Sequence, residues 1–147
     1  LLRYLVVLQT LVDGGDPALW GAHILRDRVR GESFPLLMPV VLEDKIVPPV
    51  TNRALARAVG VPHMAPVARA VDGLPVVDGP LAGNLDGLTA AYFQLDREGD
   101  PPVTATHNGA PTGLQGAHQA LAFWTGWLDG APVIVDPYAE LDTPALP

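Results

Sequence analysis

The stretch that decides the fold is residues 36–48, which read LLMPVVLEDKIVP. Its first seven residues form a continuous apolar run, the pattern of a strand buried on both faces of a mainly parallel sheet. Pro39 removes one donor from the hydrogen-bond ladder and is the feature of the run that argues against a strand. The polar residues 43–48 predict a loop at the carboxyl end of this strand, and Asp44 lies in that loop.

A helix is predicted directly after the loop. Thr51 or Asn52 is a suitable N-cap, residues 53–59 continue as a helix, and Gly60 ends it before Pro62. The order along the chain is therefore a strand, a loop that carries an acid, and a helix.

Two further helices are predicted upstream of the strand. Residues 1 to about 12 place leucines and a valine on one helical face, and the glycines that follow end the helix. Asp16 is a natural N-cap with Pro17 at the first helical position, which predicts a short second helix to about Leu25.

The middle of the chain contains shorter patterns. Residues 61–80 alternate valine with proline and glycine, which predicts short strands or a hairpin around Asp72-Gly73. Residues 88–95 fit a strand or a helix equally, because eight residues are too few for the periodicity to decide. Residues 103–106 are a β-prone run that ends immediately before His107.

The last part of the chain contains the longest predicted helix. Residues 114–128 form it, and residues 133–137 predict a last short strand or an extended tail. The predicted apolar face of the helix consists of Ala117, Leu121, Trp124 and Leu128. Strands that alternate with helices predict an α/β layer architecture, in which chemistry collects at the carboxyl ends of the strands.

Composition excludes several functional classes. The 147 residues allow one domain, and 48% hydrophobic against 17% charged residues argues against disorder. A net charge of −7 argues against binding to nucleic acid or to an anionic membrane surface, because both require a positively charged protein surface. The absence of cysteine excludes disulfides, thiolate metal sites and cysteine nucleophiles. The apolar run near residue 5 is too short for a membrane-spanning segment, so none is expected.

Asp44 and His107 are the residues with the strongest chemical signal, since each lies just beyond a predicted strand. Acyl transfer by a serine nucleophile requires a histidine as general base and a carboxylate that fixes its tautomer. In α/β-hydrolases the chain order is serine, acid, histidine. Ser33, the only serine, has no G-x-S-x-G pattern and precedes a strand, so the nucleophile is expected upstream of residue 1.

Residues 44–48, Asp-Lys-Ile-Val-Pro, resemble the D-x-x-V-P segment that follows the acid-bearing strand in many α/β-hydrolases. The flanking residues 8–18 and 51–62, and Thr106-His107-Asn108 with the helix behind it, extend the resemblance over most of the chain. Together they resemble the C-terminal region of bacterial lipase-like and esterase-like α/β-hydrolases, which are often exported. The resemblance implies that residues 1–147 are the C-terminal part of a single, incomplete α/β-hydrolase domain.

Two features depart from this family pattern. Glu43 stands where a glycine commonly precedes the acid, and it is a rival carboxylate next to Asp44. The sequence between Asp44 and His107 is longer than one helix and one strand require. A hairpin or lid-like insertion is therefore expected around residues 61–102.

Other histidines and a metal site are weaker alternatives. His63 is the main rival base, whereas His23 and His118 lie on predicted helices, where packing or solvent exposure is expected. No H-x-x-x-H or H-E-x-x-H pattern occurs, so zinc is not predicted. Several aspartates lie in glycine-rich loops, but the sequence contains no twelve-residue EF-hand loop, so calcium is not predicted either, and no cofactor is expected.

The resulting prediction is a serine hydrolase fragment, inactive alone, that acts on small-molecule or lipid carboxylic esters. Asp44 would orient His107, and His107 would accept the proton of the upstream serine. The alternative is a non-catalytic α/β binding or interaction module in which Asp44 and His107 never meet. Neither the oligomeric state nor the compartment follows from the sequence.

Overall fold

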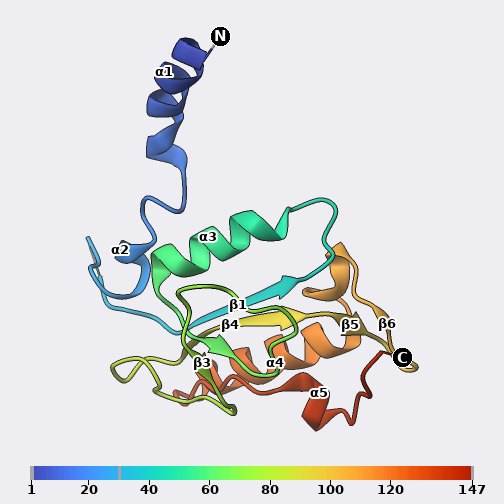
Figure 1. Cartoon of the computed structure of the whole chain (residues 1–147). Coiled ribbons are helices and arrows are strands. Elements are labelled where there is room, and N and C mark those ends of the chain that lie inside the picture. The colour runs from blue at the N-terminus through green and yellow to red at the C-terminus, as the bar shows by residue number, and fades with distance from the viewer. Residues whose placement is uncertain (1, 30, 147) are drawn as a thin grey trace.

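Four parallel strands form the main sheet in a computed structural model that describes residues 2–29 and 31–146 (Figure 1). In sheet order they are β1 (Leu36–Val41), β4 (Ala90–Leu95), β2 (His63–Met64) and β3 (Val76–Val77). The strand predicted from residues 36–42 is confirmed, and the ambiguous residues 88–95 contain a strand. Every residue of β4 is buried, because neighbouring strands and both helical layers surround it.

Pro39 fits in β1 because its nitrogen faces away from β4. Leu36 donates its N–H to Thr89 O (2.9 Å), and Leu42 donates to Leu95 O (3.0 Å). Since the donors of a strand alternate in direction, the even-numbered residues face β4 and residue 39 faces the opposite side. No described residue pairs with β1 on that side, so the proline removes no hydrogen bond from the ladder.

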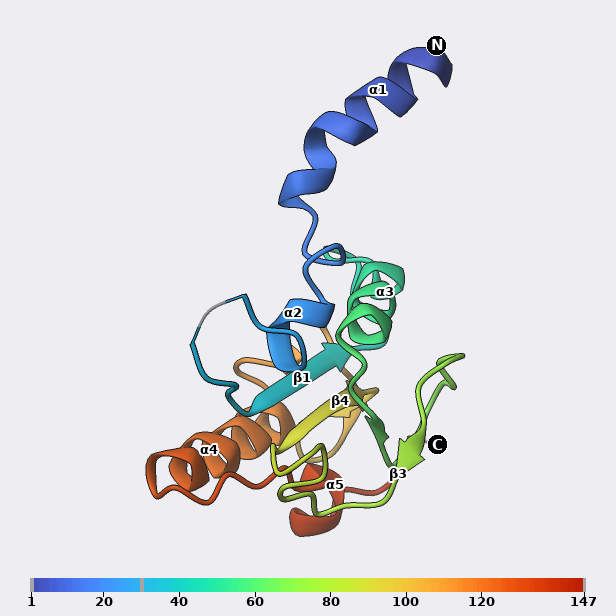
Figure 2. The ribbon, with the colours of Figure 1, turned by 90° about the vertical axis from the view of Figure 1, so that its left-hand side faces the viewer.

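Helices cover both faces of the sheet, as Figure 2 shows. One layer contains α2 (Ala22–Leu25) and α3 (Pro49–Val59), which bury Leu25, Ala56 and Val59 in one core cluster. The opposite layer contains α4 (Leu114–Leu128) and α5 (Pro137–Glu140), which bury Phe123 and Tyr138 in the other. This arrangement is the mixed α/β fold that the sequence predicted.

The capping predicted for α3 is wrong at its start and confirmed at its end. The helix begins at Pro49, and Thr51 lies within the first turn, where its hydroxyl donates to Pro48 O (2.8 Å). A proline at the first helical position needs no N–H partner, so the helix extends further back than a Thr51 or Asn52 cap would allow. Gly60 ends the helix with a φ of 78°.

The N-terminal helix is confirmed as α1 (Leu2–Val12), and residue 1 lies outside the described residues. This helix extends away from the sheet and its layers (Figures 1 and 2), and a 3-10 turn, η1 (Asp13–Gly15), follows it. The second helix is shorter than predicted. Asp16 accepts the Ala18 N–H (2.8 Å), but a turn follows, and α2 begins at Ala22.

Residues 61–102 contribute β2, β3 and β4 to the main sheet. Of the two alternatives predicted for residues 61–80, the short strands are confirmed as β2 and β3, and the hairpin around Asp72-Gly73 does not form, because these strands pair in parallel with His63 opposite Val76. A hairpin occurs further along the chain, where β5 (Arg97–Glu98) pairs antiparallel with β6 (Val103–Thr104). This hairpin connects β4 to His107.

The extent of α4 is confirmed, but the prediction of its buried face is wrong. Leu121, Trp124 and Leu128 are exposed, whereas the buried residues are Gln115, Gly116, Gln119 and Phe123. Both buried glutamines donate their side-chain N–H groups to backbone oxygens of distant residues, as in the bond from Gln119 Nε2 to Val135 O (2.8 Å).

The predicted last strand, at residues 133–137, is an extended segment that makes one isolated antiparallel bridge, between Ile134 and Leu81. Among the described helices, none has the length and apolar character needed to cross a membrane.

Candidate active site

Asp44 is held at the carboxyl end of β1 by its own loop. Its Oδ1 accepts the backbone N–H groups of Ile46 (2.8 Å) and Val47 (2.9 Å). Aspartate commonly bonds the backbone two or three residues further on, which tightens a turn. The carboxylate is only 8% exposed, and its second oxygen, Oδ2, remains available for another partner.

That partner is His107. The strands β1 and β4 are parallel neighbours, so their carboxyl ends lie at the same edge, and the β5–β6 hairpin returns the chain there. His107 begins the 3-10 turn η2 (His107–Gly109), and its Nδ1 lies 2.8 Å from Asp44 Oδ2. In a neutral imidazole, an N–H at Nδ1 that donates to the carboxylate leaves Nε2 as the basic nitrogen.

The carboxyl group of Asp44 is ionised near neutral pH. Burial acts to raise its pKa, but the hydrogen bonds from His107, Val47 and Ile46 outweigh burial and hold the pKa below the usual 3.8. A carboxylate in this state fixes the histidine tautomer and stabilises an imidazolium.

A pocket of about 380 Å³ opens beside the imidazole. Its lining residues are Glu43, Lys45, Ile46, Thr104, Ala105, Thr106 and His107. The ring of His107 is 40% exposed, and within the described part of the chain Nε2 has no hydrogen-bond partner. The basic nitrogen is therefore free to accept a proton from a molecule or group in this region.

The two adjacent carboxylates, Glu43 and Asp44, have different partners. Glu43 Oε1 pairs with Arg69 Nη2 at 3.1 Å, and both side chains are largely exposed. Consecutive residues leaving a strand point in different directions, so only one of them is directed at His107. The structure brings Asp44, and not Glu43, into contact with the histidine.

The rival base, His63, lies in the core on β2. Its side chain is fully buried, its ring packs edge-on against Tyr92 with centroids 5.0 Å apart, and neither ring nitrogen has a partner among the described residues. Burial lowers its pKa from 6.5. A histidine without access to solvent cannot exchange protons with a substrate, so His63 is unsuited to be the base.

Two other histidines and the serine are also engaged elsewhere. His23 contacts the backbone oxygen of Asp27, and His118 Nε2 lies 2.6 Å from Glu140 Oε2. Ser33 donates its hydroxyl to Leu25 O (2.9 Å), at a distinct pocket. The structure therefore does not bring Ser33 to His107.

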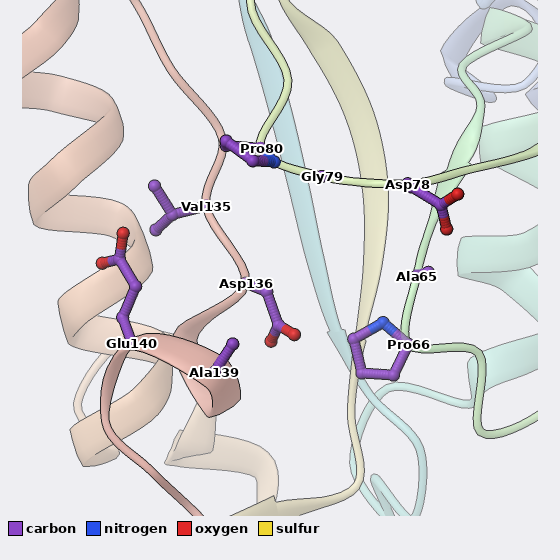
Figure 3. A pocket seen from close by; sticks show the side chains of 9 residues that line it. All are labelled: Ala65, Pro66, Asp78, Gly79, Pro80, Val135, Asp136, Ala139 and Glu140. Atoms are coloured by element: carbon purple, nitrogen blue, oxygen red, sulfur yellow. The ribbon is translucent and has the colours of Figure 1, made fainter.

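A second pocket, which the sequence did not predict, lies on the α5 side of the sheet (Figure 3). Three carboxylates line it, those of Asp78, Asp136 and Glu140. Asp136 caps α5 by accepting the Tyr138 N–H (2.9 Å), and Glu140 pairs with His118. Among the described residues, no group of three or more potential ligands is arranged to hold a metal ion.

Sequence reasoning missed Glu98, which bonds the residue before the histidine. Its Oε1 accepts both the N–H and the hydroxyl of Thr106, each at 2.9 Å. No sequence signal marks this glutamate, because its role depends on the β5–β6 hairpin.

Comparisons of the chain with protein-family models, with curated proteins and with solved structures found no match.

Proposed function

We propose that this chain supplies the acid and the base of a Ser-His-Asp triad in a hydrolase of carboxylic esters, including lipid esters. Asp44 is the acid and His107 is the base. The observation that carries the proposal is the 2.8 Å contact between Asp44 Oδ2 and His107 Nδ1, beside a pocket lined by the imidazole.

In this proposal each residue has a distinct role. Asp44 holds the His107 tautomer whose Nε2 is basic, and Nε2 removes the proton from a serine hydroxyl as that oxygen attacks the ester carbonyl. The imidazolium then donates the proton to the leaving alcohol. Water repeats the sequence on the acyl-enzyme, with His107 again as the base.

The serine itself is proposed to lie on a segment outside residues 1–147, because Ser33 is bonded elsewhere. Among the described residues, one side of β1 has no strand partner. A further parallel strand on that side would end at the same edge as β1 and β4, where Asp44 and His107 lie. A nucleophile at the end of such a strand would be close to the imidazole.

The alternative function, a non-catalytic α/β binding or interaction module, is less well supported. In such a module, Asp44 and His107 would remain apart. Their hydrogen bond, together with the ionised state of the buried carboxylate, favours a catalytic pair.

Ester hydrolysis by the full-length protein tests the proposal. With p-nitrophenyl esters of several acyl lengths, His107→Ala is expected to reduce kcat by about three orders of magnitude or more. His118→Ala is the matched control, since it removes another carboxylate-bonded histidine and should leave the rate nearly unchanged. Full activity in His107→Ala would contradict the proposal.

A second measurement separates chemistry from binding. An alkyl fluorophosphonate should label one serine of the full-length protein, and labelling should slow strongly in His107→Ala. Residues 1–147 alone are expected neither to hydrolyse these esters nor to be labelled. Labelling of Ser33 would place the nucleophile within this chain and contradict this part of the proposal.

A further inference from the structure

Glu98 connects the β5–β6 hairpin to the turn that carries His107. Oε1 of Glu98 accepts two hydrogen bonds from Thr106, from its N–H and from its hydroxyl, each at 2.9 Å. Thr106 immediately precedes His107 and accepts the Gly109 N–H at 2.7 Å. The 3-10 turn is therefore tied to Glu98 through its N-cap residue, Thr106.

The second oxygen of the same carboxylate lies against two glycines. A Cβ atom on Gly109 would lie 2.9 Å from Oε2 of Glu98, and a Cβ atom on Gly113 would lie closer still. Gly113 is the N-cap of α4, where a negative charge interacts favourably with the helix dipole. Glycine at these two positions leaves room for the carboxylate between the turn and the helix.

Hydrogen bonds from α4 and α5 anchor the hairpin that carries Glu98. Gln115, fully buried on α4, accepts the Gly99 N–H (2.8 Å) and donates to Gly99 O (3.1 Å). The hydroxyl of Tyr138 on α5 accepts the Asp96 N–H at 3.0 Å. Glu98 therefore projects from a fixed segment, which makes it a suitable support for the adjacent turn.

We infer that Glu98 is a positioning residue that holds the His107 turn so that Nδ1 meets Asp44. Glu98 touches Thr106 and the glycines, not the reacting atoms, so it acts through His107. A catalytic constellation requires such support, because a misplacement of about 1 Å can cost about 100-fold in rate. The catalytic consequence rests on the proposed function, whereas the position of the imidazole can be measured independently.

The direct test is the nuclear magnetic resonance signal of the His107 ring in ¹⁵N-histidine-labelled full-length protein, assigned with His107→Gln. In the parent protein, the proton on Nδ1 is expected to be protected and strongly downfield, because it is bonded to Asp44. Glu98→Ala is expected to abolish this protected signal, and Glu98→Gln, which keeps an oxygen acceptor, is expected to retain it.

Glu140→Ala is the matched control, since it removes the carboxylate that bonds His118. It should change the His118 signal and leave that of His107 unchanged. If Glu98→Ala does not fold, Thr106→Val decides, because it removes one of the two bonds and should weaken the protection of the Nδ1 proton. An unchanged His107 signal in a folded Glu98→Ala or in Thr106→Val would overturn the inference.

Kinetics provide the second readout. Glu98→Ala is expected to lower kcat about 10- to 100-fold with little change in KM, and Glu98→Gln to recover most of the loss. If the parent protein hydrolyses no ester but Glu98→Ala still alters the His107 signal, the proposed function fails and the positioning role stands. If hydrolysis is present and Glu98→Ala changes neither kcat nor the signal, the positioning role fails alone.

Discussion

Asp44 and His107 form a 2.8 Å hydrogen bond across 63 positions of sequence. Two parallel neighbours, β1 and β4, make this possible, because their carboxyl ends lie at one edge of the sheet. The loop of residues 43–48 then directs one carboxylate inward, and the β5–β6 hairpin returns the chain to the same edge.

Replacing Asp44, the proposed acid, should impair the proposed ester hydrolysis while leaving the fold intact. Asp44→Asn in the full-length protein is expected to lower kcat about 10³- to 10⁴-fold, because an amide neither fixes the required tautomer nor stabilises the imidazolium. Steady-state ester hydrolysis measures this effect. Glu43→Gln is the control for the adjacent carboxylate and should retain most activity, since Glu43 pairs with Arg69. Equal losses in both variants would contradict the assignment.

The low pKa of Asp44 predicts a specific dependence of stability on acid. A carboxyl group whose pKa is lower in the folded state stabilises the fold above pH 3.8, and this contribution is lost as the pH falls through the lowered pKa. The difference in unfolding free energy between the parent and Asp44→Asn should therefore shrink as the pH falls below 3.8. Urea unfolding at each pH measures it, and a difference independent of pH down to the lowest value would be inconsistent with the bond to His107.

The buried His63 should make the unfolding free energy depend on pH in a higher range than Asp44 does. Burial lowers its pKa, so below pH 6.5 the unfolded chain binds a proton that the folded chain excludes. Stability is then complete above pH 6.5 and decreases as the pH falls below it, by at most about 1.4 kcal/mol per pH unit for one proton. His63→Phe keeps a ring against Tyr92 and should remove this decrease between pH 6.5 and pH 5. His23→Phe, at a partly exposed position on α2, should leave this decrease in place.

Tyr138 predicts a stability effect at the end of β4. Its buried hydroxyl accepts the N–H groups of Asp96 (3.0 Å) and Arg97 (3.3 Å) and donates to Arg97 O (3.1 Å). Burial raises the pKa of Tyr138 to about 12, so the hydroxyl remains protonated and able to donate. Tyr138→Phe leaves these groups unpaired and is expected to cost about 1–3 kcal/mol of unfolding free energy. Tyr4→Phe, at an exposed position on α1, should change stability by less than about 0.5 kcal/mol.

Side chains on the two faces of α4 should differ in how much they contribute to stability. Phe123 is 4% exposed and Trp124 is 65% exposed, although the sequence pattern placed Trp124 on the buried face. Phe123→Ala is expected to cost about 3–5 kcal/mol, because it creates a cavity in the core beneath the sheet. Trp124→Ala should cost about 0.5 kcal/mol or less. Chemical denaturation of both variants measures the loss of unfolding free energy. A larger loss for Trp124→Ala would contradict the assignment of Phe123 to the buried face of α4.

Local features of the sequence were sufficient for most of the secondary structure. The apolar run at residues 36–42 became β1, and Gly60 ended α3 with a positive φ. The limits of α4 also agreed with the pattern. Each of these depends on interactions between residues a few positions apart, which a sequence contains directly. Asp44 and His107 were identified in the same way, as a carboxylate and an imidazole just beyond β-prone runs.

Tertiary structure decided what depends on contacts between distant segments. It placed β4 between β1 and β2, so that β2, β3 and β4 lie in one sheet with β1, and β2 and β3 pair in parallel instead of forming a hairpin around Asp72-Gly73. It selected Asp44 over Glu43 as the partner of His107, and it buried the glutamine-bearing face of α4, where the side-chain N–H groups donate to backbone oxygens of distant residues.

The supporting role of Glu98 also arose only in the folded chain, where the β5–β6 hairpin brings its carboxylate to Thr106. The sequence by itself therefore determined β1, the end of α3 and the limits of α4, and which residues carry chemically useful groups. Only the tertiary structure decided which of those groups meet, because strand pairing and burial are settled by the packing of the whole chain and not by neighbouring residues.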